Sequence, residues 1–223
     1  MPVFEDNNAW KIELYEHLLA LFELAGPGKT EQQLLRYFSV LSAQPVALRM
    51  IPVLFEVTAS ERAAFRVALY HLIQQGWLDY DATGMTCRCP PLIQEVMRYR
   101  LAADARNCRL LLKGLSKLVR IDPAKDQRTE KFPWLVQAMT VLERVDAEHE
   151  LMIRLQFETG ILLQHFGKYE VARKLMENAL ASITASPDAN DSPEPPAPET
   201  EQAEVEPEKP TPATDDLPPP IRD

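Results

Sequence analysis

The segment Gly26-Pro27-Gly28-Lys29-Thr30 carries residue types that can bind phosphate, because a glycine-rich turn before Lys and Thr resembles the end of a nucleotide-binding loop. The full pattern also requires a glycine at position 23, where this chain has Glu23. It requires a preceding β-strand as well, whereas residues 10–25 have the apolar periodicity of an amphipathic helix. We therefore expect a turn between two helices, with no bound cofactor.

Cys87 and Cys89 are the residues that come nearest to a metal-binding pattern. Zinc usually takes four ligands in pairs set two to four residues apart, and the four histidines of this chain are scattered along its length. We expect packing thiols and no metal. With Cys108 they form a sparse, odd-numbered set, which is typical of reduced thiols and a cytoplasmic protein.

Histidine, serine and acidic residues show no arrangement suited to nucleophilic catalysis. Glu148 and Glu150 flank His149, and we expect all three on a solvated helix face. The sequence therefore predicts no catalytic residues and a protein that is not an enzyme.

The composition changes sharply near residue 186. Residues 186–223 hold eleven acidic and two basic residues, a net charge of −9, with eleven of the nineteen prolines and no aromatic residue. Such a segment cannot bury enough apolar surface to offset its ordering entropy, so we expect a disordered acidic tail, either solubilising or folding on a partner. No apolar run is long enough for a transmembrane helix, and the N-terminus lacks the features of a secretory signal.

The remaining chain has the apolar spacing of helices, with two short strand-like pieces at residues 77–80 and 85–89. Capping-box spacings, Thr30 with Gln33 and Thr58 with Glu61, mark two helix starts, and Gly76 marks a helix end. The expected helices cover residues 10–25, 30–41, 48–55, 62–75, 92–101, 104–119, 132–145, 148–166 and 169–183.

Three helices followed by a β-hairpin is the element order of a winged helix-turn-helix domain. Its third helix would read DNA in a transcriptional regulator, with Arg62, Arg66, His71 and Gln74 projecting from it. Nucleic-acid binders usually carry a clustered basic patch, whereas residues 1–185 have 22 basic and 22 acidic residues. A winged helix used for packing and relay is therefore the favoured interpretation, and DNA binding is the alternative.

Small residues and one tyrosine recur at fixed offsets near the end of the helical region: Gly160, Gly167, Tyr169, Ala172 and Ala179. This spacing resembles the tetratricopeptide repeat, a helix-turn-helix unit that binds other proteins. We expect the glycine and alanines to let two helices approach closely, Gly167 to form the turn and Tyr169 to fill the groove. An ordinary amphipathic helical hairpin is the alternative.

The order of these pieces resembles the C-terminal half of an NB-ARC-type (STAND) signalling ATPase over residues 10–185. The matching segments are Leu34-Leu-Arg-Tyr-Phe38-Ser-Val-Leu41, Ala68-Leu-x-x-Leu72-Ile-x-x-Gly76-Trp77-Leu78, Pro91-Leu-Ile-Gln-Glu-Val96, and Ile121-Asp-Pro-Ala-Lys125 with Lys131-Phe-Pro133. The resemblance implies a winged helix, a helical linker and tetratricopeptide repeats. The family's phosphate-binding loop is not found in these residues, and Pro90 stands where relatives have a nucleotide-sensing histidine.

We therefore expect an all-α protein with a small β-wing, a tetratricopeptide-like hairpin and a non-catalytic, regulatory or scaffolding function. A protein partner is expected, rather than nucleic acid or a membrane. The last repeat face has three possible covers: the helices of residues 104–145, a second copy in a homo-oligomer, or the partner. We expect those helices to cover one side and a partner to cover the other. The expected parts are residues 1–29 (N-terminal helix), 30–101 (winged helix), 102–146 (linker), 147–185 (repeat) and 186–223 (tail).

Overall fold

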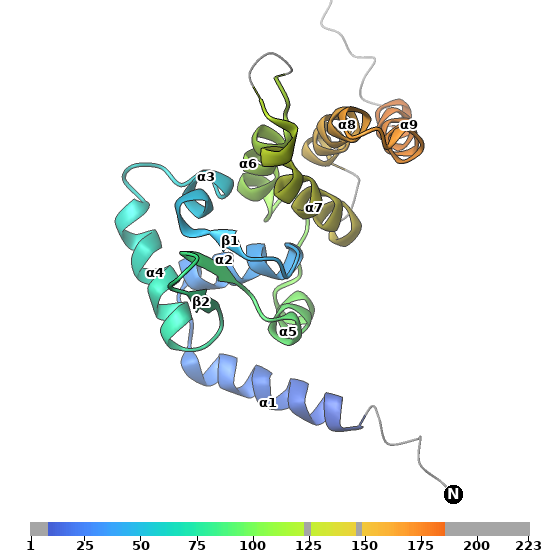
Figure 1. The fold of residues 1–223 in the computed structure, drawn as a ribbon. Helices are drawn as coiled ribbons and strands as arrows, with labels where there is room; N and C mark the ends of the chain where they lie inside the picture. The colour runs from blue at the N-terminus through green and yellow to red at the C-terminus, as the bar shows by residue number, and fades with distance from the viewer. Residues whose placement is uncertain (1–8, 123–125, 146–148, 186–223) are drawn as a thin grey trace, which may run out of the picture. The chain divides into compact units, whose positions relative to one another are not determined.

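Helices make up most of the computed structural model, which describes residues 9–122, 126–145 and 149–185 (Figure 1). The predicted tail, residues 186–223, lies outside the described residues. The described helices are α1 (Ala9–Ala25), α2 (Lys29–Val40), the 3₁₀ turn η1 (Leu48–Met50), α3 (Ile51–Leu54), α4 (Arg62–Gln74), α5 (Pro91–Leu101), α6 (Arg109–Val119), α7 (Arg128–Arg144), α8 (Glu150–His165) and α9 (Tyr169–Ala185).

The described strands form one small antiparallel sheet in the order β1-β3-β2. β2 (Asp79–Asp81) and β3 (Thr86–Arg88) are the predicted hairpin, and the side chain of Asp81 accepts hydrogen bonds from two backbone N–H groups of its turn. β1 (Val46–Ala47) adds a third strand beside β3, which the sequence did not predict. A two-residue strand after a proline has no alternation to reveal it.

The start of α2 differs from the prediction. The helix begins at Lys29 with Gly28 as its N-cap, and the Glu31 carboxylate accepts the Gly28 N–H at 2.7 Å. The Thr30–Gln33 capping box is therefore wrong, because the reciprocal carboxylate lies one residue after Thr30. Before α4, by contrast, Thr58 and Glu61 do pair, with the Thr58 N–H donating to Glu61 Oε2 at 3.1 Å.

Two other helix starts were misplaced. Residues 104–108 form a turn rather than the first part of α6, because the Asp104 side chain accepts the N–H groups of Arg106 and Asn107 at 2.8 Å each. α7 begins four residues before the predicted Phe132 and carries Pro133 inside it. Pro133 is the sixth residue of α7, beyond the first turn, so it removes the hydrogen bond that its N–H would otherwise donate to the Thr129 carbonyl.

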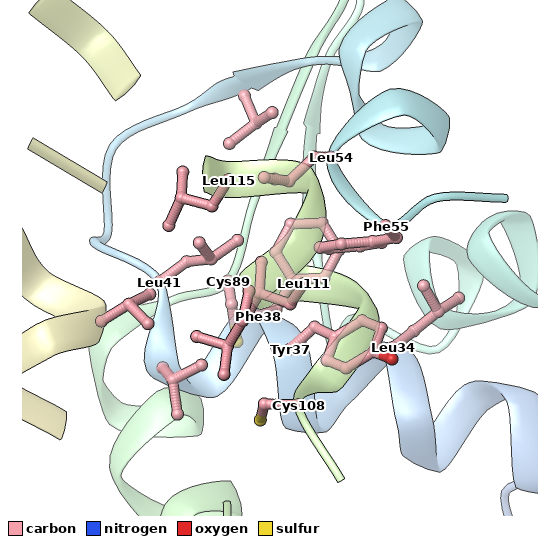
Figure 2. Close-up of a cluster of buried hydrophobic side chains, with 14 of the residues drawn as sticks. Leu34, Tyr37, Phe38, Leu41, Leu54, Phe55, Cys89, Cys108, Leu111 and Leu115 are labelled. Atoms are coloured by element: carbon pink, nitrogen blue, oxygen red, sulfur yellow. The ribbon is translucent and has the colours of Figure 1, made fainter. Parts of the chain in front are cut away.

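The main core lies where α2, α3 and α6 meet (Figure 2). Leu111 and Leu115 of α6 are fully buried there beside Leu54 and Phe55. α6 approaches α3 so closely that a Cβ on Gly114 would lie 2.0 Å from the Leu54 carbonyl oxygen. α6 also packs against α7 and α8, and α8 packs against α9, so the core continues into the C-terminal hairpin.

A buried polar network closes the C-terminal end of α2. Gln94 of α5 is 2% exposed, and its amide donates to the carbonyls of Phe38 at 2.9 Å and Leu41 at 3.1 Å. Arg144 of α7 donates to the carbonyls of Ser39 and Leu41 and, at 3.4 Å, to the Gln94 side-chain oxygen. The last carbonyls of a helix have no intrahelical partner, so α5 and α7 supply the missing donors.

Within the described ranges, no helix is both long and apolar enough to cross a membrane.

Candidate functional site

The turn that resembles a phosphate-binding loop connects α1 to α2. A helix precedes it, as the sequence predicted, and Gly26 takes a φ of +58°, which glycine adopts at little cost. The Glu31 carboxylate already accepts the Gly28 N–H at the start of α2. A carboxylate there would repel a phosphate, so this turn offers no site for a nucleotide.

His149 has a structural role at the start of α8. Its Nδ1 accepts the N–H of Leu151 at 3.1 Å, which caps one of the free donors of the first turn. His149 is therefore a half-buried N-cap rather than part of a solvated helix face, whereas Glu150 is exposed as predicted and Glu148 lies outside the described residues.

The three cysteines are free and buried. Cys87 lies in β3, Cys89 follows that strand, and Cys108 is the N-cap of α6. Figure 2 shows Cys89 and Cys108 in the main core. Burial raises the pKa of Cys87 and of Cys108 to about 12, and it raises the pKa of Cys89 as well. Across the described ranges, no group of three or more histidine, cysteine or acidic residues lies close enough to hold a metal ion.

The cysteine environment predicts slow thiol chemistry and a loss of stability at high pH. An unfolded thiol has a pKa near 8.5, so a raised folded-state pKa stabilises the fold below that pH and the gain is lost as pH rises toward 12. Each thiol then lowers the unfolding free energy by up to about 1.4 kcal/mol per pH unit. Urea melts between pH 7 and 10 measure this fall, and Cys108→Ala should reduce its slope. Rapid modification of all three thiols in the folded chain by a disulfide reagent would contradict the prediction.

Arg62 and Arg66 both lie on the exposed side of α4. Gln74 is exposed as well, whereas His71 is held by the Glu31 carboxylate of α2. The same side of α4 also exposes two large side chains, Val67 and Tyr70. The surface around the two arginines is therefore mixed rather than uniformly basic.

Small residues lie where α8 and α9 approach each other. A Cβ on Gly160 would meet the Met176 side chain at 2.8 Å, and Ala172 and Ala179 are buried. Gly167 ends α8 with a φ of +72°, and the Lys168 N–H bonds back to a carbonyl of α8. This turn is a glycine C-cap, which reverses the chain so that α9 returns along α8.

Tyr169 differs from the prediction. Its side chain is 68% exposed, so it does not fill the groove between the two helices. Tyr169 is the first residue of α9, and its side chain lies beside Arg173 and Met176 at the rim of a surface hollow. Leu163 of α8, by contrast, is almost fully buried.

An apolar groove runs along the hairpin between α8 and α9. It has a volume of about 510 Å³, and Phe157 and Leu180 on its walls are 52% and 62% exposed. The residues that line it are Glu150, Ile153, Arg154, Phe157, Met176, Ala179, Leu180 and Ile183. Glu150 and Ala179 were named from the sequence for other reasons, but the exposed apolar residues Phe157, Leu180 and Ile183 were not predicted to form a surface. They occupy apolar positions outside the core face of an amphipathic helix, and that signal could have indicated them.

The groove is a candidate for a functional site among the described residues. It is almost wholly apolar, with Glu150 and Arg154 as its charged members. α8 is covered by α6 and α7, as we expected for the linker helices, and that packing leaves the groove open. Such a surface is suited to contact with apolar side chains.

No protein-family model matches the chain, and no curated protein and no solved structure matches it significantly.

Proposed function

We propose that this chain is a non-catalytic interaction module in which a winged helix supports a tetratricopeptide-like hairpin. In this proposal it corresponds to the regulatory part of an NB-ARC-type signalling protein, without the nucleotide-binding core. The α8–α9 groove binds a partner protein, and the remaining helices hold the hairpin in place.

The element order supports the winged-helix part of the proposal. α2, α3 and α4 are followed by the β2–β3 hairpin, and β1 joins the hairpin from between α2 and α3. In such a domain the hairpin is the wing and α4 is the third helix. The close approach at Gly160 and the Gly167 turn support the tetratricopeptide-like part.

The observation that carries the proposal is the open α8–α9 groove. Phe157, Leu180 and Ile183 are exposed together along it, whereas monomeric proteins rarely leave a continuous apolar surface open without a function. Two antiparallel helices form a groove that accepts the apolar side of a third helix. An amphipathic helix of a partner protein is therefore the occupant that we propose.

Affinity capture with the full chain tests this function. We expect Phe157→Asp/Leu180→Asp to lose the partner that the wild-type chain retains, because two buried charges in the interface have no counter-ion. Val171→Asp is the matched control, since Val171 is exposed on α9 but does not line the groove. Recovery of the same proteins by the groove variant, or tight ATP binding by the purified chain in calorimetry, would contradict the proposal.

The second candidate function is DNA binding through α4. Its support is the exposure of Arg62 and Arg66 on the outer side of that helix. Against it stand the exposed Val67 and Tyr70 beside them, since phosphate contacts are made by cationic and polar groups. The mixed α4 surface therefore favours a protein contact.

A further inference from the structure

Helix α6 has a continuous row of basic side chains on its exposed side. Arg109, Lys113 and Lys117 lie on the helix, with Arg106 in the preceding turn and Arg120 at its C-terminal end, and all five are exposed. The spacing places them on one side, because residues three and four apart are neighbours on a helix surface. From Arg109 to Arg120 the row extends about 16 Å along the axis.

The charges on this side of α6 are largely uncompensated. Residues 105–121 contain no aspartate or glutamate. Lys117 pairs with Glu56 at 2.7 Å, whereas within the described residues no carboxylate forms a salt bridge with Arg106, Arg109, Lys113 or Arg120. The opposite side of α6 carries the leucines of the core, so packing fixes the direction in which the row faces.

The chemistry of the row indicates what it binds. Protein interfaces usually have an apolar centre and few lysines, whereas this row has two lysines, and the one large apolar side chain exposed beside it, among residues 105–121, is Leu110, at 37%. Single-stranded nucleic acids are usually held by stacking on aromatic rings, and no aromatic residue occurs in residues 105–121. A straight, rigid row of cations fits the equally rigid row of phosphates along a duplex.

We propose that α6 binds the phosphate backbone of double-stranded DNA through Arg106, Arg109, Lys113 and Arg120. The contact is independent of base sequence, because these side chains face phosphates and no groove-reading helix is part of it. It is separate from the α8–α9 groove and from Arg62 and Arg66 of α4. The net charge of the full chain is −9, so the local cluster must hold the DNA against overall repulsion.

Fluorescence anisotropy of the full chain with a mixed-sequence duplex of about 20 base pairs, longer than the row of cations, tests this inference. Four phosphate contacts give a slope of log K against log salt of about −3 to −4, so the affinity should fall roughly 100-fold between 50 and 200 mM salt. Arg109→Ala/Lys113→Ala should weaken binding by about 10-fold or more at 50 mM salt and reduce the slope by about 2. A duplex of scrambled sequence should bind equally well.

The controls separate the three surfaces. Arg62→Ala/Arg66→Ala and Lys174→Ala, on α4 and α9, should leave the affinity unchanged, and so should the groove variant Phe157→Asp/Leu180→Asp. No duplex binding at 50 mM salt, or unchanged affinity in the α6 variant, would overturn the proposal. Tighter binding to single-stranded DNA, or binding to polyglutamate without binding to the duplex, would overturn it in favour of another anionic partner. Circular-dichroism melts of the variants establish that each is folded, because all the substituted side chains are exposed.

Discussion

Gly114→Ala should destabilise the protein by about 3 kcal/mol, although the same change in an open helix stabilises by about 1 kcal/mol. The added Cβ would lie 2.0 Å from the Leu54 carbonyl oxygen and 2.7 Å from its carbon. Both atoms belong to the backbone, so the clash cannot be relieved by a rotamer change, and α6 must move away from α3. The shift would also loosen Leu111 and Leu115, which pack in the same contact (Figure 2).

Thermal unfolding followed by circular dichroism measures this loss. A destabilisation of about 3 kcal/mol corresponds to a fall of roughly 6–12 °C in Tm for a chain of this size. Gly160→Ala is the matched control, because it also adds a methyl group at a buried helical glycine. There the nearest atom is Met176 Cγ, a side chain that can rotate, so a smaller loss is expected. Equal Tm values for Gly114→Ala and the wild type would show that α3 and α6 are not held at this distance.

Gln94→Leu should cost about 2–3 kcal/mol, although leucine is the more hydrophobic residue and has a similar size. The glutamine amide donates to the carbonyls of Phe38 and Leu41 at the end of α2. Arg144 still reaches the Leu41 carbonyl in the variant, whereas the Phe38 carbonyl loses the side-chain donor that bonds it. A buried acceptor left without a donor carries its full desolvation cost.

Urea unfolding provides the measurement, with a lower midpoint and an unchanged m-value expected for Gln94→Leu. Gln156→Leu is the control, because Gln156 is similarly buried, at 6% exposure, but its side-chain oxygen has no hydrogen-bond partner among the described residues. Replacing an unsatisfied amide by leucine should be neutral or stabilising. If both variants lose the same stability, the network at the end of α2 contributes nothing beyond side-chain packing.

Apolar periodicity predicted the positions of most helices well. Apolar spacing indicated α4, α5 and α9 close to their observed bounds. A helix that packs one side on the core has apolar residues at the helical period, so its extent can be read from the sequence. The start of α6 was misplaced because Asp104 captures N–H groups through its side chain, an effect that apolar spacing does not record. β1 was missed because its pairing with β3 is a contact between segments distant in the chain.

The candidate sites were less predictable than the helices. Small residues at Gly160 and Ala172 indicated a close helix pair, but nothing in their spacing shows that Phe157 and Leu180 remain uncovered on its other side. Overall charge was misleading for α6, because a neutral total over residues 1–185 conceals a row of five exposed bases, three on this helix and two next to its ends. Neither the α8–α9 groove nor the basic row at α6 can be identified without the orientation of these helices, which depends on the packing of the whole core.

The position of α6 determines which helices are expected to unfold together. One side of this helix contacts α3, α7 and α8, while Arg144 of α7 bonds to carbonyls at the end of α2. A local opening of the C-terminal hairpin would therefore expose leucines of α6 that also pack against the N-terminal helices. Hydrogen exchange in α2, α6 and α8 should then occur through a shared cooperative opening, as one foldon, rather than in separate steps.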